Sequence, residues 1–386
     1  MKKNILYICP SSGLGGAETF LKTTFTYHDS NRFSPTYLLF QHGPLADWLT
    51  ANNADYEVLP QRPRLSRPFS IVSTHNWIQQ QIGKKSVHLV HSTMAYAALF
   101  ASFATRGSRC PHVWFQHGPA SGWMDQAAAL LPHAGVLVNS EYTLQTQKNL
   151  EKPLSIFLSN KQRFFEKIDL GTPEPAHTTH ESDEFRKKLF TQHNLPSNTV
   201  IFSMACRLQK WKGVELVIEA ARKLREQPLF VVIYGDTFDS EDYVQQLKSS
   251  ASGLPVYFAG SVKNVPLAFS ASDVVINASL QPEPFGLSII ESLAVARPVI
   301  VPNEGGPLEI IQDQKCGLFF AARSAQSLSE KILWMLADRE RRLQMEKSAR
   351  ERYQKHYTAK NMIQQLESVY DRLVPGPVSG HNVLTR

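Results

Sequence analysis

The sequence is short of cysteine and of long apolar runs, and each absence excludes a class of protein. Its 386 residues include four cysteines, which are widely separated and form no Cys-x-x-Cys pair, so neither a disulfide framework nor a zinc site is indicated. No apolar stretch approaches the ~18 residues of a membrane-spanning helix. The apolar run within residues 1–10 is too short for a signal peptide, and we expect a cytoplasmic protein.

Composition and charge are those of a globular enzyme. Hydrophobic residues make up 42% and charged residues 19% of the chain, and the length predicts two domains of roughly 150–200 residues each. Residues 1–170 hold 16 Lys and Arg against 10 Asp and Glu, which leaves 25 against 24 for the rest. The basic first part fits an anionic acceptor or peripheral contact with an anionic membrane surface, and it fits ordinary surface variation equally well.

Short apolar segments alternate with longer amphipathic ones, which predicts parallel sheets with crossover helices. Residues 1–170 are expected to form a first doubly wound, Rossmann-like domain, and 171–196 a linker running into a short helix capped by Ser182. Residues 197–374 are expected to form a second Rossmann-like domain whose last helix could pack back on the first. Residues 375–386 are predicted to be a disordered tail. Open sheets of this kind bind ligands at the carboxyl ends of their strands, so a cleft between the two domains is the expected active site.

Individual strands follow from the apolar segments. In the first domain they are predicted at residues 5–9, 36–41, 56–59, 87–91, 112–116, 136–139 and 156–158. In the second domain they are predicted at residues 200–204, 229–234, 256–259, 274–278, 298–301 and 318–320.

The stretch 281–309 carries the strongest chemical signal. Glu283 and Glu291 are separated by seven residues, and Pro284 with the apolar run after it predicts a helix that begins near Gly286. A helix start can bind phosphate through its free N–H groups, and a carboxylate in the early turns can accept hydrogen bonds from ribose hydroxyls. The pattern suggests a nucleotide diphosphate sugar, although two glutamates at this spacing also arise by chance.

Two further motifs stand at predicted strand ends. Gly15 and Gly16 follow the first strand and would permit a tight turn and close approach of a ligand, unless they form only a glycine turn. Arg207 and Lys212 follow the first strand of the second domain. They are placed to bind a pyrophosphate, Arg by paired hydrogen bonds and Lys as a point charge, unless they are only solvated surface charge.

Taken together, these motifs resemble those of glycosyltransferase family 4. The resemblance rests on Gly15-Gly16-Ala-Glu, Arg207-Leu with Lys212-Gly, Glu283-Pro-Phe-Gly-Leu with Glu291, Arg297-Pro-Val, and Gly305-Gly306 with Glu309, in family order from about residue 5 to residue 320. It implies the two-domain GT-B fold and transfer of a sugar from a nucleotide donor with retention at the anomeric carbon.

The resemblance also implies a role for each matching residue. Arg207 and Lys212 would bind the donor diphosphate, Glu291 the nucleotide ribose, and Glu283 would orient the donor sugar. The remaining members are the backbone of Phe285, Gly286 and Leu287 at phosphate and sugar, Gly15 and Gly16 at the donor phosphate, and His117 near the transferred sugar.

Some positions fit the family less well. His117 could instead be a structural histidine. His91, at the end of an earlier predicted strand, is a weaker candidate for an active-site histidine. Cys206 and Arg297 stand where the family usually has glycine, which we interpret as local loop changes. The glycine-rich turn that the family often has after residue 234 is also missing, so the nucleobase is not predicted.

No Asp-x-Asp pair occurs in the sequence, which argues against a metal-bound diphosphate. We therefore expect a metal-independent enzyme that uses a UDP- or GDP-sugar as co-substrate and has no other cofactor. Its acceptor would be a glycan or a lipid-linked sugar in cell-surface polysaccharide or lipopolysaccharide synthesis, and no nucleic-acid partner is expected. A sugar-nucleotide epimerase or phosphorylase, or a non-catalytic subunit that binds nucleotide sugars, are the alternatives.

Overall fold

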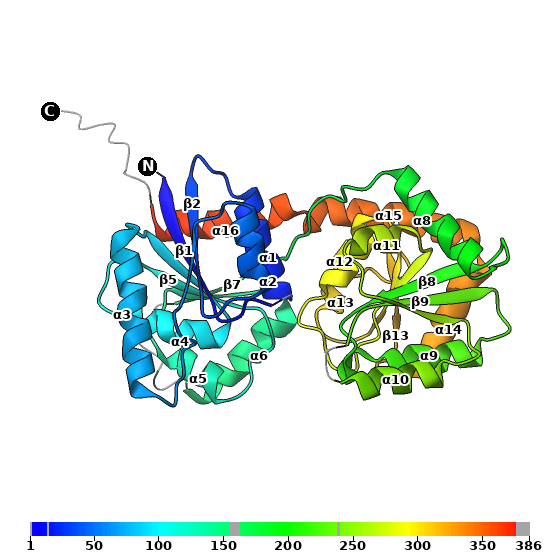
Figure 1. The fold of residues 1–386 in the computed structure, drawn as a ribbon, viewed down its shortest axis with the longest axis horizontal. Coiled ribbons are helices and arrows are strands. Elements are labelled where there is room, and N and C mark those ends of the chain that lie inside the picture. The colour runs from blue at the N-terminus through cyan, green and yellow to red at the C-terminus, as the bar shows by residue number, and fades with distance from the viewer. Residues whose placement is uncertain (1, 14, 155–156, 158–162, 238–239, 376–386) are drawn as a thin grey trace. The chain divides into compact units, whose positions relative to one another are not determined.

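The computed structural model describes residues 2–13, 15–154, 157, 163–237 and 240–375. The chain divides into two compact units, one formed by Met1–Leu170 with Ala359–Arg386 and the other by Gly171–Thr358 (Figure 1). In this division the last helix, which the sequence placed at the end of 197–374, belongs to the first unit.

The first unit is a parallel α/β structure. Its seven-stranded sheet has the order β3-β2-β1-β4-β5-β6-β7, and every pairing in it is parallel. Its elements are β1 (Lys3–Cys9), α1 (Gly16–Tyr27), β2 (Phe33–Leu39), α2 (Pro44–Ala51), β3 (Tyr56–Val58), α3 (Pro68–Lys84), β4 (Leu89–Thr93), α4 (Met94–Thr105), β5 (His112–Gln116), α5 (Trp123–Leu130), β6 (Gly135–Val138), α6 (Glu141–Glu151), a 3-10 turn (Lys152–Leu154), β7 (Phe164–Lys167) and α16 (Ala359–Leu373).

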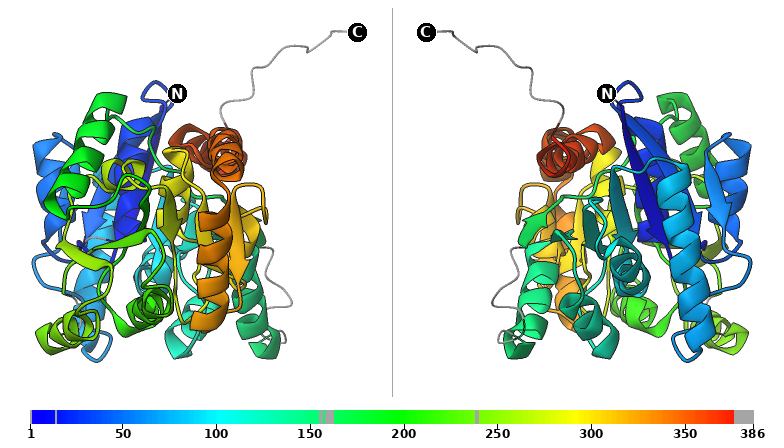
Figure 2. Two further views of the ribbon diagram at one scale, coloured as in Figure 1. Left: turned by 90° about the vertical axis from the view of Figure 1, so that its right-hand side faces the viewer. Right: turned by 90° about the vertical axis from the view of Figure 1, so that its left-hand side faces the viewer.

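Alternate residues of each central strand face opposite layers of helices, because side chains in a strand point to alternate sides. On β1, Leu6 and Ile8 pack in one core cluster with the buried residues of α3 and α4. Tyr7 points to the other face, where its ring lies 6.4 Å from that of Phe20 in α1. Helices thus cover both faces of the sheet (Figures 1 and 2).

Helix α16 is fastened to this second face by a buried hydrogen-bond network. The Tyr370 hydroxyl lies 2.9 Å from the Tyr7 hydroxyl and 2.7 Å from His91 Nδ1. Nε2 of His28 lies 2.6 Å from the Tyr7 hydroxyl, and its Nδ1 lies 2.9 Å from Glu367 Oε1. The network joins two strands, β1 and β4, to α16 and to the C-terminal end of α1, which are far apart in the sequence.

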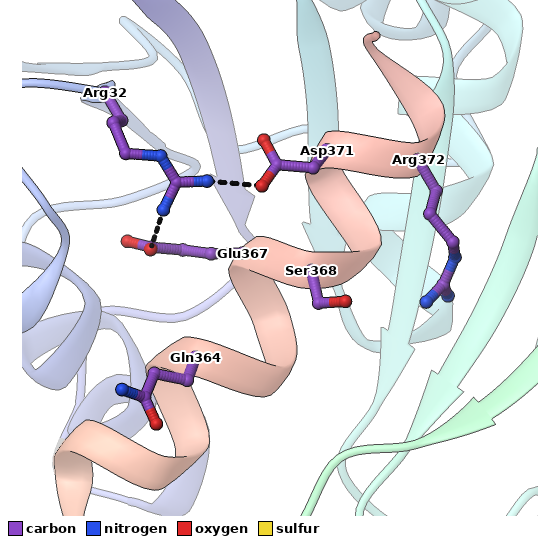
Figure 3. A pocket seen from close by; sticks show the side chains of 6 residues that line it. All are labelled: Arg32, Gln364, Glu367, Ser368, Asp371 and Arg372. Atoms are coloured by element: carbon purple, nitrogen blue, oxygen red, sulfur yellow. Dashed lines mark hydrogen bonds and ion pairs between the residues drawn. The ribbon is translucent and has the colours of Figure 1, made fainter.

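A pocket of about 390 Å³ lies along α16 on the outside of this network. Arg32 points across it toward Glu367 and Asp371 and forms ion pairs with both (Figure 3). The other residues that line the pocket are Gln364, Ser368 and Arg372. Because its acids are paired with Arg32, we interpret the pocket as part of the attachment of α16.

The second unit repeats the architecture with six strands. Their order is β10-β9-β8-β11-β12-β13, again parallel throughout. Its elements are α8 (Thr179–Gln192), β8 (Val200–Ala205), a 3-10 turn (Lys210–Lys212), α9 (Val214–Lys223), β9 (Leu229–Tyr234), α10 (Glu241–Ser250), β10 (Val256–Gly260), α11 (Val265–Ser270), β11 (Val274–Ile276), α12 (Leu287–Ala294), β12 (Val299–Pro302), α13 (Pro307–Ile310), β13 (Gly317–Phe320), α14 (Ala325–Ala337), α15 (Arg339–Arg352) and a π-helical turn (Tyr353–Tyr357).

Two core clusters lie on opposite faces of this sheet. One joins α9, α10 and α14 to the strands, and the other joins α8 and α11 to β8 and β9. The segment expected as a linker, 171–196, therefore contributes a 14-residue helix to the core.

The predicted Ser182 cap of that helix is wrong. Thr178 is the N-cap: its hydroxyl accepts a hydrogen bond from the Glu181 N–H at 3.2 Å, and the Glu181 carboxylate accepts one from the Thr178 N–H at 2.7 Å. This reciprocal capping box satisfies two free N–H groups at once, so the helix begins one turn earlier than a single serine cap would place it.

Most strands lie within one to three residues of their predicted positions. The strand β7 was not among the predicted strands. Of the strand predicted at 156–158, residues 156 and 158 lie outside the described residues, as do residues 376–386 of the predicted tail. In the described ranges, no helix combines the length and the apolar character needed to cross a membrane.

Candidate functional site

The predicted site residues of the second unit lie on two loops that leave neighbouring strands and in the first two turns of helix α12. β8 and β11 are paired in the sheet, and Arg207 and Lys212 follow β8 whereas Glu283 follows β11. The loops touch through their backbones: Gly213 has φ +70°, and a Cβ there would lie 2.0 Å from the carbonyl oxygen of Ala278. Glycine is required at this position, because both the left-handed conformation and the close contact exclude a side chain.

Glu283 is the centre of a buried polar cluster. Its Oε1 accepts hydrogen bonds from Lys212 Nζ at 2.5 Å, from Ser279 Oγ at 2.6 Å and from Asn277 Nδ2 at 3.4 Å. Within the described chain, Oε2 accepts no hydrogen bond. The carboxylate is therefore fixed by one oxygen and can accept a hydrogen bond from a ligand hydroxyl with the other.

Lys212 is held from two sides. Its side chain is 16% exposed and pairs with Glu283, while its Nζ lies 3.8 Å from the centroid of the Trp211 ring. The aromatic face and the carboxylate both stabilise the ammonium charge, so its position is determined before a ligand arrives. The structure brings Lys212 and Glu283 together, which the sequence did not predict.

The loop that carries Glu283 is backed by two glycines. Gly305 has φ +71°, and a Cβ there would lie 2.7 Å from the Glu283 carbonyl oxygen. The N–H of Gly306 donates to the same carbonyl at 2.8 Å. The predicted motif Gly305-Gly306 therefore supports the site by close backbone packing.

Helix α12 begins where the sequence predicted. Gly286 is the N-cap with φ +119°, and Leu287 is the first helical residue. Phe285 is buried, with its ring 6.1 Å from that of Tyr357. The free N–H groups of the first helical turn therefore follow directly after Glu283, on a loop whose conformation requires glycine.

Glu291 lies in the second turn of α12 and is half-buried. Burial raises the pKa of its carboxyl group to about 7, because the charged form loses hydration. No side chain of the described residues donates a hydrogen bond to it. Near neutral pH the carboxyl group is thus present in both protonation states and can donate or accept a hydrogen bond.

Arg207 is exposed and lies two residues beyond the end of β8. Nearby, burial raises the pKa of the Cys206 thiol to about 12. Arg297, the other departure from the family pattern, forms an ion pair with Glu346 at 2.9 Å and donates to the Ser270 carbonyl at 2.8 Å. Its role here is structural, since it joins α11, α12 and α15.

In the first unit, His117 lies just after β5 in an aromatic environment. Its ring stacks on Phe115 at 4.2 Å and lies 5.1 Å from that of Phe20. Both ring nitrogens are buried without a hydrogen-bond partner among the described residues. Burial lowers the pKa of His117 to about 3, because the charged form would lose its hydration, so the imidazole is neutral.

His91 is fully buried in β4 and bonded to Tyr370 through Nδ1. Its Nε2 has no partner among the described atoms, and burial lowers its pKa well below the usual value. Its hydrogen bond to α16 gives His91 a structural role, which the sequence left open.

Gly15 is the N-cap of α1 and Gly16 the first helical residue. Gly15 has φ −159° and ψ −175°, an extended conformation open to any residue, so the predicted tight turn does not need glycine there. A Cβ would lie 2.9 Å from the Glu18 carboxylate, whose partner is the Ser11 hydroxyl. Gly15, Gly16 and His117 belong to the first unit and the other site residues to the second.

Sequence reasoning missed the residues that surround the pair Lys212 and Glu283. Asn277 and Ser279 are small polar residues directly after an apolar strand, a signal that could have been used. Trp211 carried no such signal. With four neighbours it lines a second pocket of about 390 Å³ beside the site, formed by Gln209, Lys210, Trp211, Leu280 and Gln281.

Comparison with known proteins adds a family match and a fold. Residues 185–352 match the family model described as glycosyl transferases group 1, and all the predicted site residues of the second unit lie in that range. WclY, a glycosyltransferase of O-antigen biosynthesis from Escherichia coli, is 26% identical over 182 residues, which are 47% of this chain and 49% of that protein. The chain thus matches about half the length of this relative.

Two solved structures match almost the whole chain. A glycosyltransferase from Rickettsia africae has a TM-score of 0.84 and 21% identity, covering 97% of this chain and 99% of its own. HepE of Anabaena in complex with UDP has a TM-score of 0.81 and 21% identity, covering 96% and 100%. The fold is GT-B. At these identities the likeness establishes the GT-B fold, as predicted, and no more.

Proposed function

We propose that the protein is a retaining glycosyltransferase of the family 4 type, which transfers a sugar from a nucleoside diphosphate sugar to a hydroxyl group of a glycan or lipid-linked acceptor. The observation that carries the proposal is the cluster of Lys212, Glu283 and the start of α12 at neighbouring strand ends. It combines a fixed cation, a carboxylate with one available oxygen, and free N–H groups.

The diphosphate is the part of the donor that needs positive charge. Lys212 and Arg207, with the N–H groups of Gly286 and Leu287, would stabilise the charge that develops on the leaving diphosphate, without a metal ion. The resemblance to family 4 assigns Gly15 and Gly16 to the donor phosphate as well, and neither carries a side chain that would obstruct a ligand.

The sugar and the ribose need hydrogen-bond partners. Glu283 Oε2 would accept a hydrogen bond from a sugar hydroxyl, and Phe285 would shape the backbone beside it. Glu291, with a pKa of about 7, would bond the two ribose hydroxyls. The neutral His117 would contact the transferred sugar with a ring nitrogen.

In the reaction, the acceptor oxygen forms a bond to the anomeric carbon while the bond from that carbon to the diphosphate oxygen breaks. The nucleoside diphosphate leaves with the electron pair, and the acceptor proton passes to its departing phosphate oxygen. Attack occurs on the face from which the diphosphate leaves, so the anomeric configuration is retained. Glu283 orients the sugar and does not act as a nucleophile.

The donor is proposed to be a UDP- or GDP-sugar, and the acceptor a cell-surface polysaccharide or lipopolysaccharide precursor, used at the cytoplasmic face of the membrane. Support comes from HepE of Anabaena, whose structures contain UDP and UDP-glucose, and from the O-antigen assignment of WclY.

Thermal-shift screening with UDP-, GDP- and ADP-sugars identifies the donor base, since a ligand that binds only the folded state raises the melting temperature. Incubation of that labelled donor with lipid-linked acceptors should give a product whose anomeric configuration, read by NMR, matches the donor. Transfer should be lost in Lys212→Ala and Glu291→Ala, and kept in Lys210→Ala. Full turnover in both site variants contradicts the proposal.

A further inference from the structure

The positive charge of the first unit is concentrated where acids are missing. Residues 58–124 contain seven Lys and Arg and no Asp or Glu, in a chain that has 34 acidic residues. The acids at the two borders of this stretch are engaged: Glu57 accepts a hydrogen bond from Gln81 and pairs with Lys84, and Asp125 accepts hydrogen bonds from Gln116 and from the Ser121 N–H.

Three arginines of this stretch lie together on the turn that leads into α3. Arg62, Arg64 and Arg67 are all exposed, and none of them forms an ion pair within the described chain. The Arg67 N–H donates to the Arg64 carbonyl at 3.1 Å, and the Arg64 N–H donates to Ser70 Oγ at 2.9 Å. These bonds fix the turn, so the three charges are presented by an ordered surface.

Exposed apolar side chains adjoin the arginines. Phe69 is 91% exposed, the highest value among the exposed large hydrophobic residues described, and Val72 is 57% exposed. They are three residues apart on α3, so they lie on the same side of the helix. Ile71 and Ile78, in contrast, pack in the core of the unit. The first turns of α3 are therefore apolar on two sides, and one of those sides faces water.

The start of α3 is also unusual for a helix. Arg67 occupies the N-cap position without a side-chain cap, and the first turn contains no acid. Helix starts usually carry a capping oxygen or an acid, because their N–H groups and dipole are positive. Adding an arginine raises the positive potential there, which is favourable when an anion lies against the surface.

We propose that Arg62, Arg64, Arg67, Phe69 and Val72, here called the α3 patch, dock the protein on an anionic lipid bilayer. The arginines would contact lipid phosphates while Phe69 and Val72 enter the interface between headgroups and acyl chains. A bilayer fits this combination better than a polyanion in solution does, because charge alone would not use an exposed phenyl ring. The proposal goes beyond sugar transfer and does not depend on it.

The test is sedimentation of the full-length protein with vesicles, without donor or acceptor. Wild-type protein should bind phosphatidylcholine vesicles that contain phosphatidylglycerol and should not bind pure phosphatidylcholine. The triple variant R62Q/R64Q/R67Q should bind the anionic vesicles on the order of a hundredfold more weakly, since each arginine near such a surface contributes about fivefold. F69S should weaken binding about tenfold by removing buried apolar area.

Matched controls separate the patch from net charge. The control K187Q/K223Q/K248Q also removes three positive charges, but from exposed positions of the second unit. The control L343S removes an apolar side chain of α15 that is 40% exposed. Both should bind anionic vesicles within about twofold of wild type, the effect of a distant surface change. A cooperative melting transition, measured in parallel, should be kept in all five proteins, which shows that they are folded.

Three results would overturn the proposal. The first is that wild-type protein does not bind anionic vesicles. The second is that R62Q/R64Q/R67Q and K187Q/K223Q/K248Q lose the same amount of vesicle binding. The third is that wild-type protein binds single-stranded RNA and does not bind vesicles. Failure to bind nucleotide sugars would contradict the proposed function and leave the vesicle result unaffected, so the two failures are distinguishable.

Discussion

The two units stabilise their buried polar side chains at strand ends in different ways. In the second unit the buried Glu283 side chain is paired with a cation: Lys212 Nζ lies 2.5 Å from it, and two further side chains donate hydrogen bonds to it. In the first unit His117 is kept neutral among aromatic rings, with a pKa of about 3. The charged arrangement suits an anionic ligand, and the neutral one suits hydrogen bonds and apolar contact with an uncharged ligand.

The largest predicted effect comes from removing the positive charge of Lys212. Lys212→Met would leave the buried Glu283 carboxylate unpaired, and removing one partner of such a pair costs about 3–5 kcal/mol of unfolding free energy. Transfer should fall by a factor on the order of 10²–10³, because a group that stabilises the developing charge is lost. Urea unfolding and a transfer assay measure the two effects.

Two controls make this result interpretable. Lys210→Met, on the same turn but exposed, should change stability by less than about 0.5 kcal/mol. The double variant Lys212→Met/Glu283→Gln should recover much of the stability, since the uncompensated charge is gone, and remain inactive. If Lys212→Met is as stable as wild type, the ion pair with Lys212 does not stabilise the buried Glu283 carboxylate.

Glu291 gives the second unit a pH dependence. Its folded pKa is raised to about 7 from 4.5, so the folded protein binds a proton that the unfolded chain has released in this range. Stability therefore falls as pH rises from about 4.5 to 7, by an amount on the order of 3 kcal/mol. Glu291→Gln should flatten this decline in melting curves recorded across the range. An unchanged slope would show that Glu291 has an ordinary pKa.

His117 gives the first unit the opposite pH dependence. Its folded pKa is lowered to about 3 from 6.5, so between these values the unfolded chain binds a proton that the folded protein does not. Stability is lost as pH falls below about 6.5, by roughly 2 kcal/mol at pH 5. His117→Gln should reduce this loss in urea titrations at pH 7 and 5. An imidazole NMR titration that found a pKa near 6 would contradict the prediction.

The fold was largely predictable because both sheets are buried on both faces. Central strands such as β8 and β9 read as continuous apolar runs, which locate them well. The edge strand β7 was missed because its sequence, Phe-Phe-Glu-Lys, has no such run and none of its residues is fully buried. The Thr178 cap was missed because both Thr178 and Ser182 are residue types that can cap a helix. The backbone geometry of the structure shows that Thr178 is the N-cap.

The candidate site was predictable in part. Glu283, Gly286 and Lys212 could be found because they stand at strand ends and helix starts, where backbone geometry restricts the residue types. The ion pair of Lys212 with Glu283 could not be predicted, because it depends on the neighbouring positions of β8 and β11 in the sheet. The contact of His91 with Tyr370 is likewise non-local, since 279 residues separate the two.

The smallest predicted effect tests the buried hydrogen-bond network that attaches α16 to the sheet of the first unit. Tyr370→Phe keeps the ring and removes a hydroxyl that lies 2.9 Å from Tyr7 and 2.7 Å from His91. The expected loss is about 1–2 kcal/mol, because His91 Nδ1 is left buried without its partner. Tyr37→Phe is the matched control: Tyr37 is also fully buried and stacks on Tyr7 at 5.4 Å, but its hydroxyl bonds only weakly, to Thr24 at 3.1 Å. An equal or larger loss in the control would show that the hydrogen bond to His91 contributes no special stability to the attachment of α16.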